Sequence, residues 1–279
     1  MISPCWLSAL TFLLLLDLTF ARQIALLIID VQNCFLPGGS LAVAEGDKVI
    51  PVINNIRSEY KADISLVALS QDWHCSDHIS FASQHKGAGP VIQLLYDKSG
   101  SLCDENNNCT EVAYNLTQHL WPDHCVINTS SANFSLSLTQ EPSDIVIRKG
   151  YNCKVDSYSA FYDNGGFRYT ELHDKLQEAG IEAIIITGLA RDYCVYYTAM
   201  DAKQLGYETY VVLDATRPVT KATGDSAVAD MKIKGIHIIE SPDVATVIAQ
   251  LTSDAIHLQS PFIIMISMIL CFIKCVVCM

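Results

Sequence analysis

Short apolar runs alternate with stretches of helical periodicity along most of this chain of 279 residues. The clearest example is residues 183–206, where β-branched residues are followed by a turn and then by apolar positions at near-helical spacing. An apolar run bounded by turn signals predicts a strand buried on both faces, and the spacing beyond it predicts a helix. Asp192 can cap this helix, Gly206 suits its end, and Cys194 lies in its first turn.

The same alternation recurs along the chain. We expect strands at 23–29, 64–69, 145–147, 210–213 and 236–239, and helices at 47–60, 172–179, 227–234 and 242–251. Strands that alternate with helices predict an α/β fold, a three-layer sandwich whose mostly parallel sheet carries helices on both faces. Ligands of such folds bind at the carboxyl ends of the strands. Residues 85–143 show little periodicity, and we interpret them as a long excursion that carries functional loops.

Both ends of the chain are apolar. Residues 7–18, followed by small residues at Thr19 and Ala21, predict a cleaved signal peptide over 1–21. Within the tail, 254–279, residues 261–279 are apolar apart from Lys274 and a few small polar residues, and small residues at 253–255 and a short polar spacer precede them. That order is typical of a GPI-anchor signal, and a single membrane span is the alternative. The globular domain is then expected at 22–253.

The net charge excludes one class of partner, and the glycosylation motifs indicate the cellular compartment. The net charge is −12 and no cluster of Lys or Arg occurs, which argues against nucleic acid as a partner. Four N-glycosylation sequons lie close together, at Asn108, Asn115, Asn128 and Asn133. With the signal peptide they indicate a glycoprotein at the outer cell surface, attached to the membrane through its lipid anchor.

The eleven cysteines fit the same compartment. Cys5 leaves with the signal peptide, and three more belong to the tail. Seven remain in the domain, namely Cys34, Cys75, Cys103, Cys109, Cys125, Cys153 and Cys194. If Cys194 is a free thiol, the other six form three disulfides, for which about fifteen connectivities exist. Cys103 and Cys109 flank a polar turn and are the pair that we predict.

Four predicted strands end in residues with reactive side chains, and under this topology they meet at one edge. They deliver Asp30, Asp72 with His74, Lys149 and Cys194. A carboxylate can take the thiol proton and return it to a leaving amine, while the lysine keeps the carboxylate ionised and favours the thiolate. A position in the first turn of a helix also favours the thiolate. From this stretch of sequence alone, Cys194 is equally well interpreted as a small buried residue packed under the sheet.

A second cluster has the composition of a metal site. Asp72 and His74 lie two apart in an extended segment, so their side chains face the same way. His78 follows, and His124 lies in a rigid turn after Trp121 and Pro122. A carboxylate with imidazoles suits zinc, iron or manganese in an open, catalytic type of site. Isolated histidines are more often structural or surface residues.

Taken together, these segments resemble the nicotinamidases of the isochorismatase-like cysteine hydrolase superfamily. The resemblance runs from about residue 24 to the region of Pro218 and rests on five ordered blocks. These are Asp30-Val31-Gln32-Asn33 with Phe35; Asp72-Trp73-His74 with His78-Ile79-Ser80-Phe81; Trp121-Pro122-x-His124-Cys125; Lys149-Gly150 with Tyr158-Ser159-Ala160-Phe161; and Gly188-Leu189-Ala190-x-Asp192-Tyr193-Cys194-Val195.

The resemblance implies a role for each matching position. Asp30, Lys149 and Cys194 would be the catalytic triad. The metal ligands would be Asp72, His74 and His124, with His78 as a fourth ligand in some members and zinc as the metal we expect first. The pyridine ring would lie against Phe35, Trp121 and Tyr158. A cis Leu189–Ala190 peptide bond would aim the N–H groups of Ala190 and Cys194 into an oxyanion hole.

The implied reaction is hydrolysis of nicotinamide to nicotinic acid and ammonia. Cys194 would attack the carboxamide carbon, Asp30 would protonate the departing ammonia, and water would hydrolyse the thioester. Family members are usually cytosolic, whereas this chain carries secretory signals at both ends. Two alternatives remain: an amidohydrolase of the same fold with another specificity, and a catalytically idle, GPI-anchored protein that uses the pocket for binding.

Overall fold

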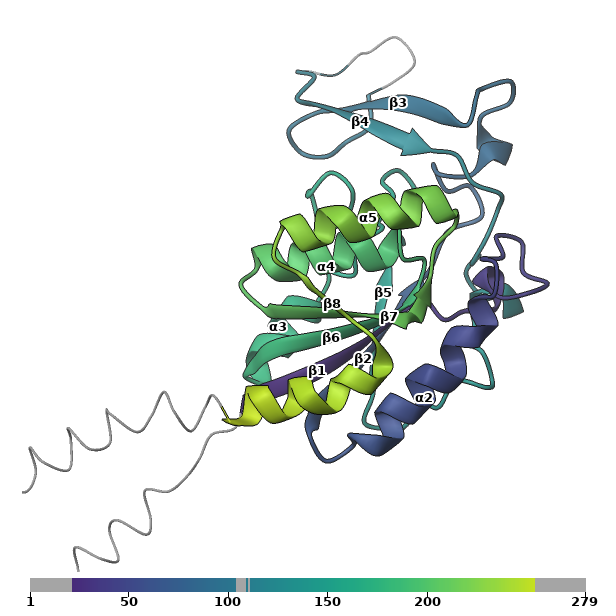
Figure 1. Ribbon diagram of the computed structural model, residues 1–279. Helices are drawn as coiled ribbons and strands as arrows, with labels where there is room; N and C mark the ends of the chain where they lie inside the picture. Colours follow the sequence, from purple (N-terminus) through teal and green to yellow (C-terminus); the bar gives the residue numbers. More distant parts are fainter. Residues whose placement is uncertain (1–21, 104–108, 110, 254–279) are drawn as a thin grey trace, which may run out of the picture. The chain divides into compact units, whose positions relative to one another are not determined.

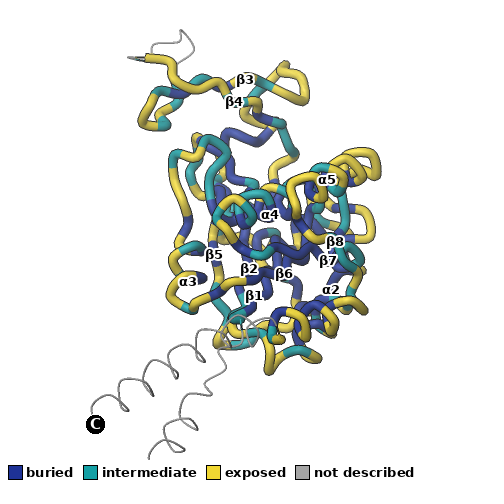
Figure 2. Tube along the Cα trace, turned by 60° about the vertical axis from the view of Figure 1, so that its left-hand side comes forward, coloured by how far each residue is buried: buried dark blue, intermediate teal, exposed yellow. Residues whose placement is uncertain are grey.

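The computed structural model describes residues 22–103, 109 and 111–253. Its main sheet has six strands in the order β5-β2-β1-β6-β7-β8, and every neighbouring pair is parallel. The strands are β1 (Gln23–Ile29), β2 (Ile64–Asp72), β5 (Ile145–Lys149), β6 (Ile181–Leu189), β7 (Glu208–Arg217) and β8 (His237–Ile239). The predicted parallel sheet is confirmed. The central strands β1 and β6 are almost entirely buried, as expected for apolar runs covered on both faces (Figure 2).

Helices cover both faces of this sheet, as predicted (Figure 1). One face carries α3 (Leu172–Glu178), α4 (Cys194–Gln204) and α5 (Lys221–Ile233), whose buried residues share one core cluster with those of β1 and β6. The other face carries α2 (Val49–Glu59), which turns Val49, Ile53 and Ile56 inward. Single 3₁₀ turns occur at η1 (Asn33–Phe35), η2 (Gly46–Lys48), η3 (Ala82–Gln84), η4 (Ser130–Ala132) and η5 (Ser241–Asp243).

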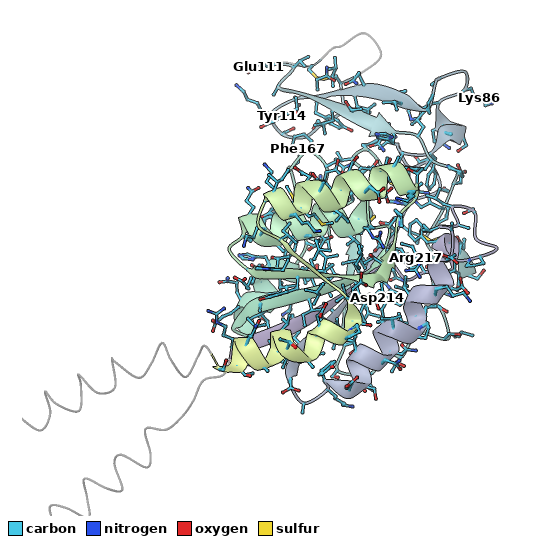
Figure 3. The ribbon with its side chains drawn as sticks, viewed as in Figure 1. Lys86, Glu111, Tyr114, Phe167, Asp214 and Arg217 are labelled. Atoms are coloured by element: carbon cyan, nitrogen blue, oxygen red, sulfur yellow. A yellow bond between two sulfur atoms is a disulfide. The ribbon has the colours of Figure 1, made fainter. Side chains whose placement is uncertain are left out.

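The region 85–143, which we interpreted as a loop excursion, contains an antiparallel hairpin. Its strands are β3 (Val91–Tyr96) and β4 (Tyr114–His119), which form a two-stranded sheet separate from the main one. A two-residue alternation was present in β3, because Ile92, Leu94 and Tyr96 share one face. They belong to a small cluster of their own with Phe167, whose ring contacts Tyr96 and Tyr114 (Figure 3). This strand has only six residues and lies next to Gly and Pro. An alternation this short was not enough to predict a strand within a mostly polar region.

Two further expectations need correction. Helix α5 begins at Lys221, earlier than 227, because the Thr220 hydroxyl caps it by accepting a hydrogen bond from the backbone N–H of Thr223. Asp192 does not cap α4. Its carboxylate instead accepts hydrogen bonds from the backbone N–H groups of Val219 and Thr220, ahead of α5.

The chain divides into a compact unit, Gln23–Val244, and a second unit made of the two chain ends. Of the second unit the structure describes Arg22 and residues 245–253, and the latter continue a helix that begins at Val244. The predicted signal peptide, the sequon at Asn108 and the predicted anchor or membrane span lie outside the described residues. Within the described part of the chain, no helix has the length and apolar character needed to span a bilayer.

Candidate active site

Four neighbouring strands of the sheet bring the predicted reactive residues together. Asp30 directly follows β1, Lys149 ends β5 and Cys194 begins α4, just beyond β6. Asp72 ends β2, where the β2–β5 register places it beside Lys149. Since β5, β2, β1 and β6 are consecutive in the sheet, their carboxyl ends form one continuous edge. The expected convergence of these side chains is therefore present.

Lys149 lies at the centre of this group. Its Nζ is 2.9 Å from Asp30 Oδ2 and 2.5 Å from Asp72 Oδ1, and it also lies 3.4 Å from Cys194 Sγ. It donates a further hydrogen bond, of 3.0 Å, to the Ser157 carbonyl. The ammonium is 1% exposed. A buried ammonium of this kind requires the two carboxylates as partners, which explains the crowding of charge.

Asp30 is held by a residue that the sequence analysis did not single out. Ser70 Oγ donates a hydrogen bond of 2.7 Å to Asp30 Oδ1. The other oxygen, Oδ2, approaches Lys149 as an ion pair outside hydrogen-bonding geometry. One carboxylate oxygen of Asp30, one of Asp72 and the Cys194 sulfur lie within 4.8 Å of one another. Asp30 is therefore placed to exchange a proton with the thiol.

Burial and close charges together set the electrostatics of the three residues. Burial raises the pKa of Cys194 well above its ordinary value, and Lys149 opposes that rise without cancelling it. Burial likewise raises the pKa of Asp30, against the opposing effect of Lys149. Burial alone would lower the pKa of Lys149, but Asp30 and Asp72 raise it well above its usual value. Desolvation therefore works against the thiolate form of Cys194, and Lys149 works for it.

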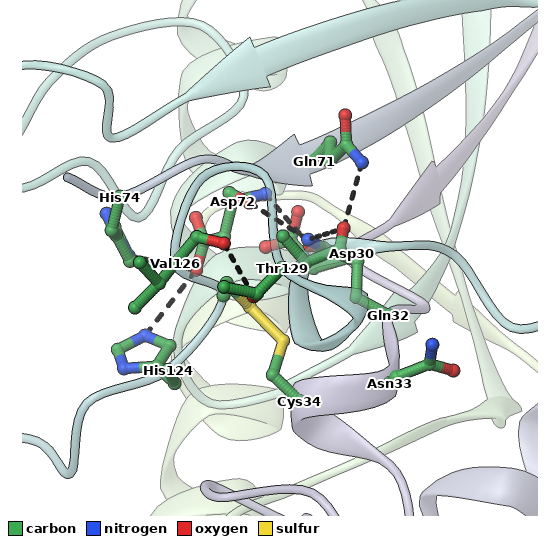
Figure 4. The surroundings of a disulfide bond; sticks show 12 residues. Asp30, Gln32, Asn33, Cys34, Gln71, Asp72, His74, His124, Val126 and Thr129 are labelled. Atoms are coloured by element: carbon green, nitrogen blue, oxygen red, sulfur yellow. Dashed lines mark hydrogen bonds and ion pairs between the residues drawn. A yellow bond between two sulfur atoms is a disulfide. The ribbon is translucent and has the colours of Figure 1, made fainter. Parts of the chain in front are cut away.

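A second group of ligand atoms adjoins the first through Asp72. Its Oδ1 contacts Lys149, while Oδ2 lies 3.5 Å from His74 Nε2 and 3.8 Å from His124 Nε2 (Figure 4). All three residues are buried, and their ligand atoms lie within 4.8 Å of one another. One carboxylate oxygen facing two imidazole nitrogens is a donor set that fits a divalent zinc, iron or manganese ion.

Backbone contacts orient both imidazoles for this role. His74 Nδ1 donates to the Gly150 carbonyl and His124 Nδ1 donates to the Pro122 carbonyl, each at 2.8 Å. With the Nδ1 protons used in this way, each Nε2 presents a lone pair toward Asp72. Gly150 is required here, since its φ is +65° and a Cβ atom would lie 2.4 Å from the His74 ring.

The protonation states of Asp72 and His124 suit a ligand set. Burial lowers the pKa of His124 to about 4, which leaves the neutral imidazole at pH 7. For Asp72, burial would raise the pKa, but Lys149 and His74 outweigh it and lower the value. For His74, burial lowers the pKa, but Asp72 outweighs it and raises the value. Carboxylate and neutral imidazole are the forms that bind a cation, so His74 would give up its Nε2 proton on binding one.

His78 is placed differently from the other candidate ligands. It stacks at 4.1 Å on the ring of His74 and groups with His74 and Asp156 rather than with Asp72 and His124. Its Nδ1 contacts Ser80 Oγ at 2.7 Å, and among the described residues Nε2 has no hydrogen-bond partner. Burial lowers its pKa to about 3. His78 therefore backs His74 in the metal-type cluster.

Aromatic rings surround the two polar groups. Phe35 lies beside His124, with ring centroids 5.5 Å apart, and Trp121 Nε1 donates to the Tyr158 hydroxyl at 3.2 Å. The sequence analysis missed Tyr193, whose ring meets both Trp121 and Tyr158 edge to face, at 4.9 and 5.4 Å. Its position next to Cys194 was the available signal. These rings supply flat apolar surface suited to an aromatic ligand.

The turn between β6 and α4 has the expected backbone. The Leu189–Ala190 peptide bond is cis, as the resemblance implied. Gly188 has a φ of +106°, and a Cβ there would lie 2.1 Å from the Ile29 carbonyl oxygen. Only glycine allows β6 to approach β1 this closely where the turn begins.

Gln32 is a further residue whose function the sequence did not reveal. Its side-chain amide is buried and makes two hydrogen bonds to the backbone of Asp72. Oε1 accepts from the Asp72 N–H at 2.8 Å, and Nε2 donates to the Asp72 carbonyl at 2.9 Å. It also donates to the Ala132 carbonyl at 2.8 Å. The loop after β1 thus fixes the end of β2 (Figure 4). The sequence shows that Gln32 lies two residues after Asp30, but it does not show that Gln32 contacts Asp72.

Comparison with known proteins agrees with this geometry. Residues 24–243 match the model of the isochorismatase domain. The chain belongs to this family. It is 42% identical over 209 residues to a nicotinamidase from Escherichia coli, covering 75% of this chain and 90% of that protein.

Solved structures of family members support the same relation. A yeast nicotinamidase bound to the inhibitor nicotinaldehyde superposes with a TM-score of 0.70 at 29% identity, covering 78% of this chain and 100% of that one. A pyrazinamidase from Pyrococcus horikoshii in complex with zinc gives a TM-score of 0.61 at 30% identity, covering 78% and 99%. The isochorismatase-like fold predicted from the sequence is thus confirmed.

Proposed function

We propose that this protein is a nicotinamidase, which hydrolyses the carboxamide of nicotinamide to nicotinic acid and ammonia. The observation that carries the proposal is the contact of one buried lysine with Asp30, Asp72 and Cys194, beside the cluster of Asp72, His74 and His124. Similarity to nicotinamidases over most of the chain supports the substrate. A small aromatic carboxamide also fits the rings of Phe35, Trp121, Tyr158 and Tyr193.

In the proposed mechanism Cys194 is the nucleophile. Its proton passes to Asp30 as Sγ attacks the carboxamide carbon, so the raised pKa of the thiol is overcome only when substrate is present. Asp30 then gives the proton to the departing ammonia. A water molecule attacks the thioester, returns a proton through Asp30, and releases the carboxylic acid and the free thiol.

Lys149 and the turn before α4 assist by stabilising charge. The ammonium compensates the negative charge that moves between Cys194 and Asp30. The backbone N–H groups of Ala190 and Cys194 form the oxyanion hole at the start of the helix. Asp72, His74 and His124 hold a divalent metal, zinc by preference, which when bound supplies a Lewis acid for the pyridine nitrogen or a water molecule.

We also propose that the enzyme works at the outer cell surface, attached through a GPI anchor, and handles extracellular nicotinamide. Three disulfides within the described residues support an oxidising compartment. The sequon residues Asn115, Asn128 and Asn133 are exposed, as glycan acceptors must be. Release from cells by a phosphatidylinositol-specific phospholipase tests the anchor, whereas retention after that treatment would favour the membrane span.

The deciding experiment measures ammonia release by the purified, metal-replete protein. Nicotinamide is compared with benzamide, which lacks the ring nitrogen, and with glutamine, which lacks the ring. We expect turnover of nicotinamide well above that of the other two. Preference for a non-aromatic amide would indicate a family member of another specificity. Absence of turnover in folded protein that binds nicotinamide would indicate the catalytically idle binding protein instead.

A further inference from the structure

Two disulfides lie one residue away from two of the proposed metal ligands. Cys75 follows His74 and pairs with Cys153, and Cys125 follows His124 and pairs with Cys34. Both bonds join distant parts of the chain, since the paired cysteines are 78 and 91 residues apart in sequence. Each bond therefore ties the segment that carries a ligand to another segment of the site.

The Cys34–Cys125 bond connects the His124 loop to the first turn after β1. Cys34, which is labelled with His124 in Figure 4, lies in η1 beside Phe35, and the Phe35 ring contacts His124. Both cysteines are fully buried. His124 belongs to no helix or strand of the main sheet, and its loop is attached to the His74 segment by two hydrogen bonds: His74 N–H to the Cys125 carbonyl at 3.1 Å and Ile127 N–H to the His74 carbonyl at 2.8 Å.

The Cys75–Cys153 bond connects the His74 segment to the loop after β5. Gly150 in that loop accepts the hydrogen bond that orients the His74 ring. The backbone adds two hydrogen bonds, from Trp73 N–H to the Lys149 carbonyl at 2.9 Å and from Ile79 N–H to the Cys153 carbonyl at 2.8 Å. The segments that follow β2 and β5 are thus joined covalently one residue after His74.

The third disulfide has none of these relations. Cys103 and Cys109 are only 6 residues apart and lie between the two strands of the hairpin, where neither cysteine adjoins a proposed ligand. It links two positions that are close together in sequence. The chain therefore contains a natural control for the effect of losing a disulfide as such.

We propose that Cys34–Cys125 and Cys75–Cys153 are positioning disulfides, which hold His124 and His74 at the separation that retains the divalent metal. This inference rests on the metal role proposed above. Ligands on loops bind a metal tightly only when their surroundings prevent the loops from moving apart. Here backbone hydrogen bonds join the ligand segments to their neighbours, and each disulfide adds a covalent constraint one residue from a ligand. The cysteines act through the histidines and do not touch the metal.

The test compares three double variants of the full chain, each loaded with zinc. They are Cys34→Ala/Cys125→Ala, Cys75→Ala/Cys153→Ala and, as the matched control, Cys103→Ala/Cys109→Ala. Transfer of zinc to a chromophoric chelator gives the rate of metal loss, and titration gives the stoichiometry at high zinc. We expect each of the first two variants to lose zinc about 10- to 100-fold faster than the wild type while still binding it at saturation. The control variant should match the wild type within about twofold.

A second measurement covers variants that fail to fold. Wild-type protein is partially reduced in its folded, zinc-loaded state and alkylated, and native mass spectrometry then records metal content and opened disulfides in the same molecules. Zinc should be missing from molecules opened at Cys34–Cys125 or Cys75–Cys153 and present in those opened only at Cys103–Cys109. Equal zinc retention in all three classes would overturn the positioning role. A wild-type protein that binds no zinc, iron or manganese would overturn the metal site itself, and this inference with it.

Discussion

The carboxyl edge of the main sheet and the β3–β4 hairpin both carry lysine–carboxylate pairs and disulfides, but they are built in opposite ways. At the edge, Lys149 is fully buried and its partner Asp72 is 77 residues distant in sequence. In the hairpin region, Lys98 pairs with Glu111 at 2.8 Å, and the two side chains are 71% and 65% exposed. The disulfides follow the same division, long-range at the edge and local in the hairpin.

This difference follows from desolvation. A charge removed from water must find its partners within the protein, so each polar group at the edge depends on groups from other strands. A charge on the hairpin keeps its water, and its partner adds little. The edge should therefore respond strongly to single substitutions in both activity and stability, whereas matched changes in the hairpin should have small effects.

Replacement of Cys194 by alanine gives the largest expected effect. Without the nucleophile, ammonia release from nicotinamide should fall by at least about 10³-fold, while the far-UV circular dichroism spectrum stays unchanged. Tyr114→Ser in the hairpin should leave turnover as in the wild type. Residual activity of more than a few per cent in the Cys194 variant would remove that residue from the nucleophile role.

Removal of the metal should come next in size. Exhaustive chelation should abolish most of the turnover, because His74 and His124 would then present no Lewis acid to the substrate. Adding back zinc, iron or manganese should restore it, and the ion that restores most identifies the metal. Activity that is indifferent to chelators would contradict the metal role of Asp72, His74 and His124.

Lys149→Met tests the buried charge against the exposed one. Loss of the ammonium leaves two buried carboxylates without a cation, so the free energy of unfolding should fall by about 3–5 kcal/mol. Urea denaturation of the metal-free protein measures this. The matched variant Lys98→Met should show no measurable change. Equal effects of the two substitutions would mean that burial does not determine how much these ion pairs contribute to the free energy of unfolding.

Gln32→Leu gives the smallest expected effect at the edge. It removes the side-chain amide that holds the Asp72 backbone, and the cost should be about 1–3 kcal/mol of unfolding free energy, with weaker metal retention. Its hairpin counterpart is Gln93→Leu, where an exposed amide contacts Thr117 Oγ1 at 3.0 Å. That variant should unfold at the same urea concentration as the wild type; a comparable loss in both would argue against a positioning role for Gln32.

Most of the site could be predicted because its residues lie at strand ends. Asp30, Asp72, Lys149 and Cys194 each follow an apolar run, and a parallel sheet brings such positions to one edge whatever the details of packing. The hairpin could not be predicted with the same ease, because its two strands form a separate small sheet and lack a long apolar run.

Other features depended on contacts that no local pattern encodes. Gln32 and Ser70 are ordinary polar residues until the fold places them against Asp72 and Asp30. The position of Cys194 at a helix start favours the thiolate, whereas burial raises the pKa of the thiol, and the degree of burial depends on the surrounding chain. Local sequence indicates the sign of an electrostatic effect but not the desolvation that competes with it.

The sequence alone determined the parallel α/β architecture, the residues at the sheet edge and the local Cys103–Cys109 pair, because periodicity and short separations are readable along the chain. Tertiary structure decided the pairing of Cys34 with Cys125 and of Cys75 with Cys153, which the sequence left among many connectivities. The tertiary structure also decided which buried side chains form hydrogen bonds and ion pairs with one another. These are properties of segments tens of residues apart, and only the folded chain sets their distances.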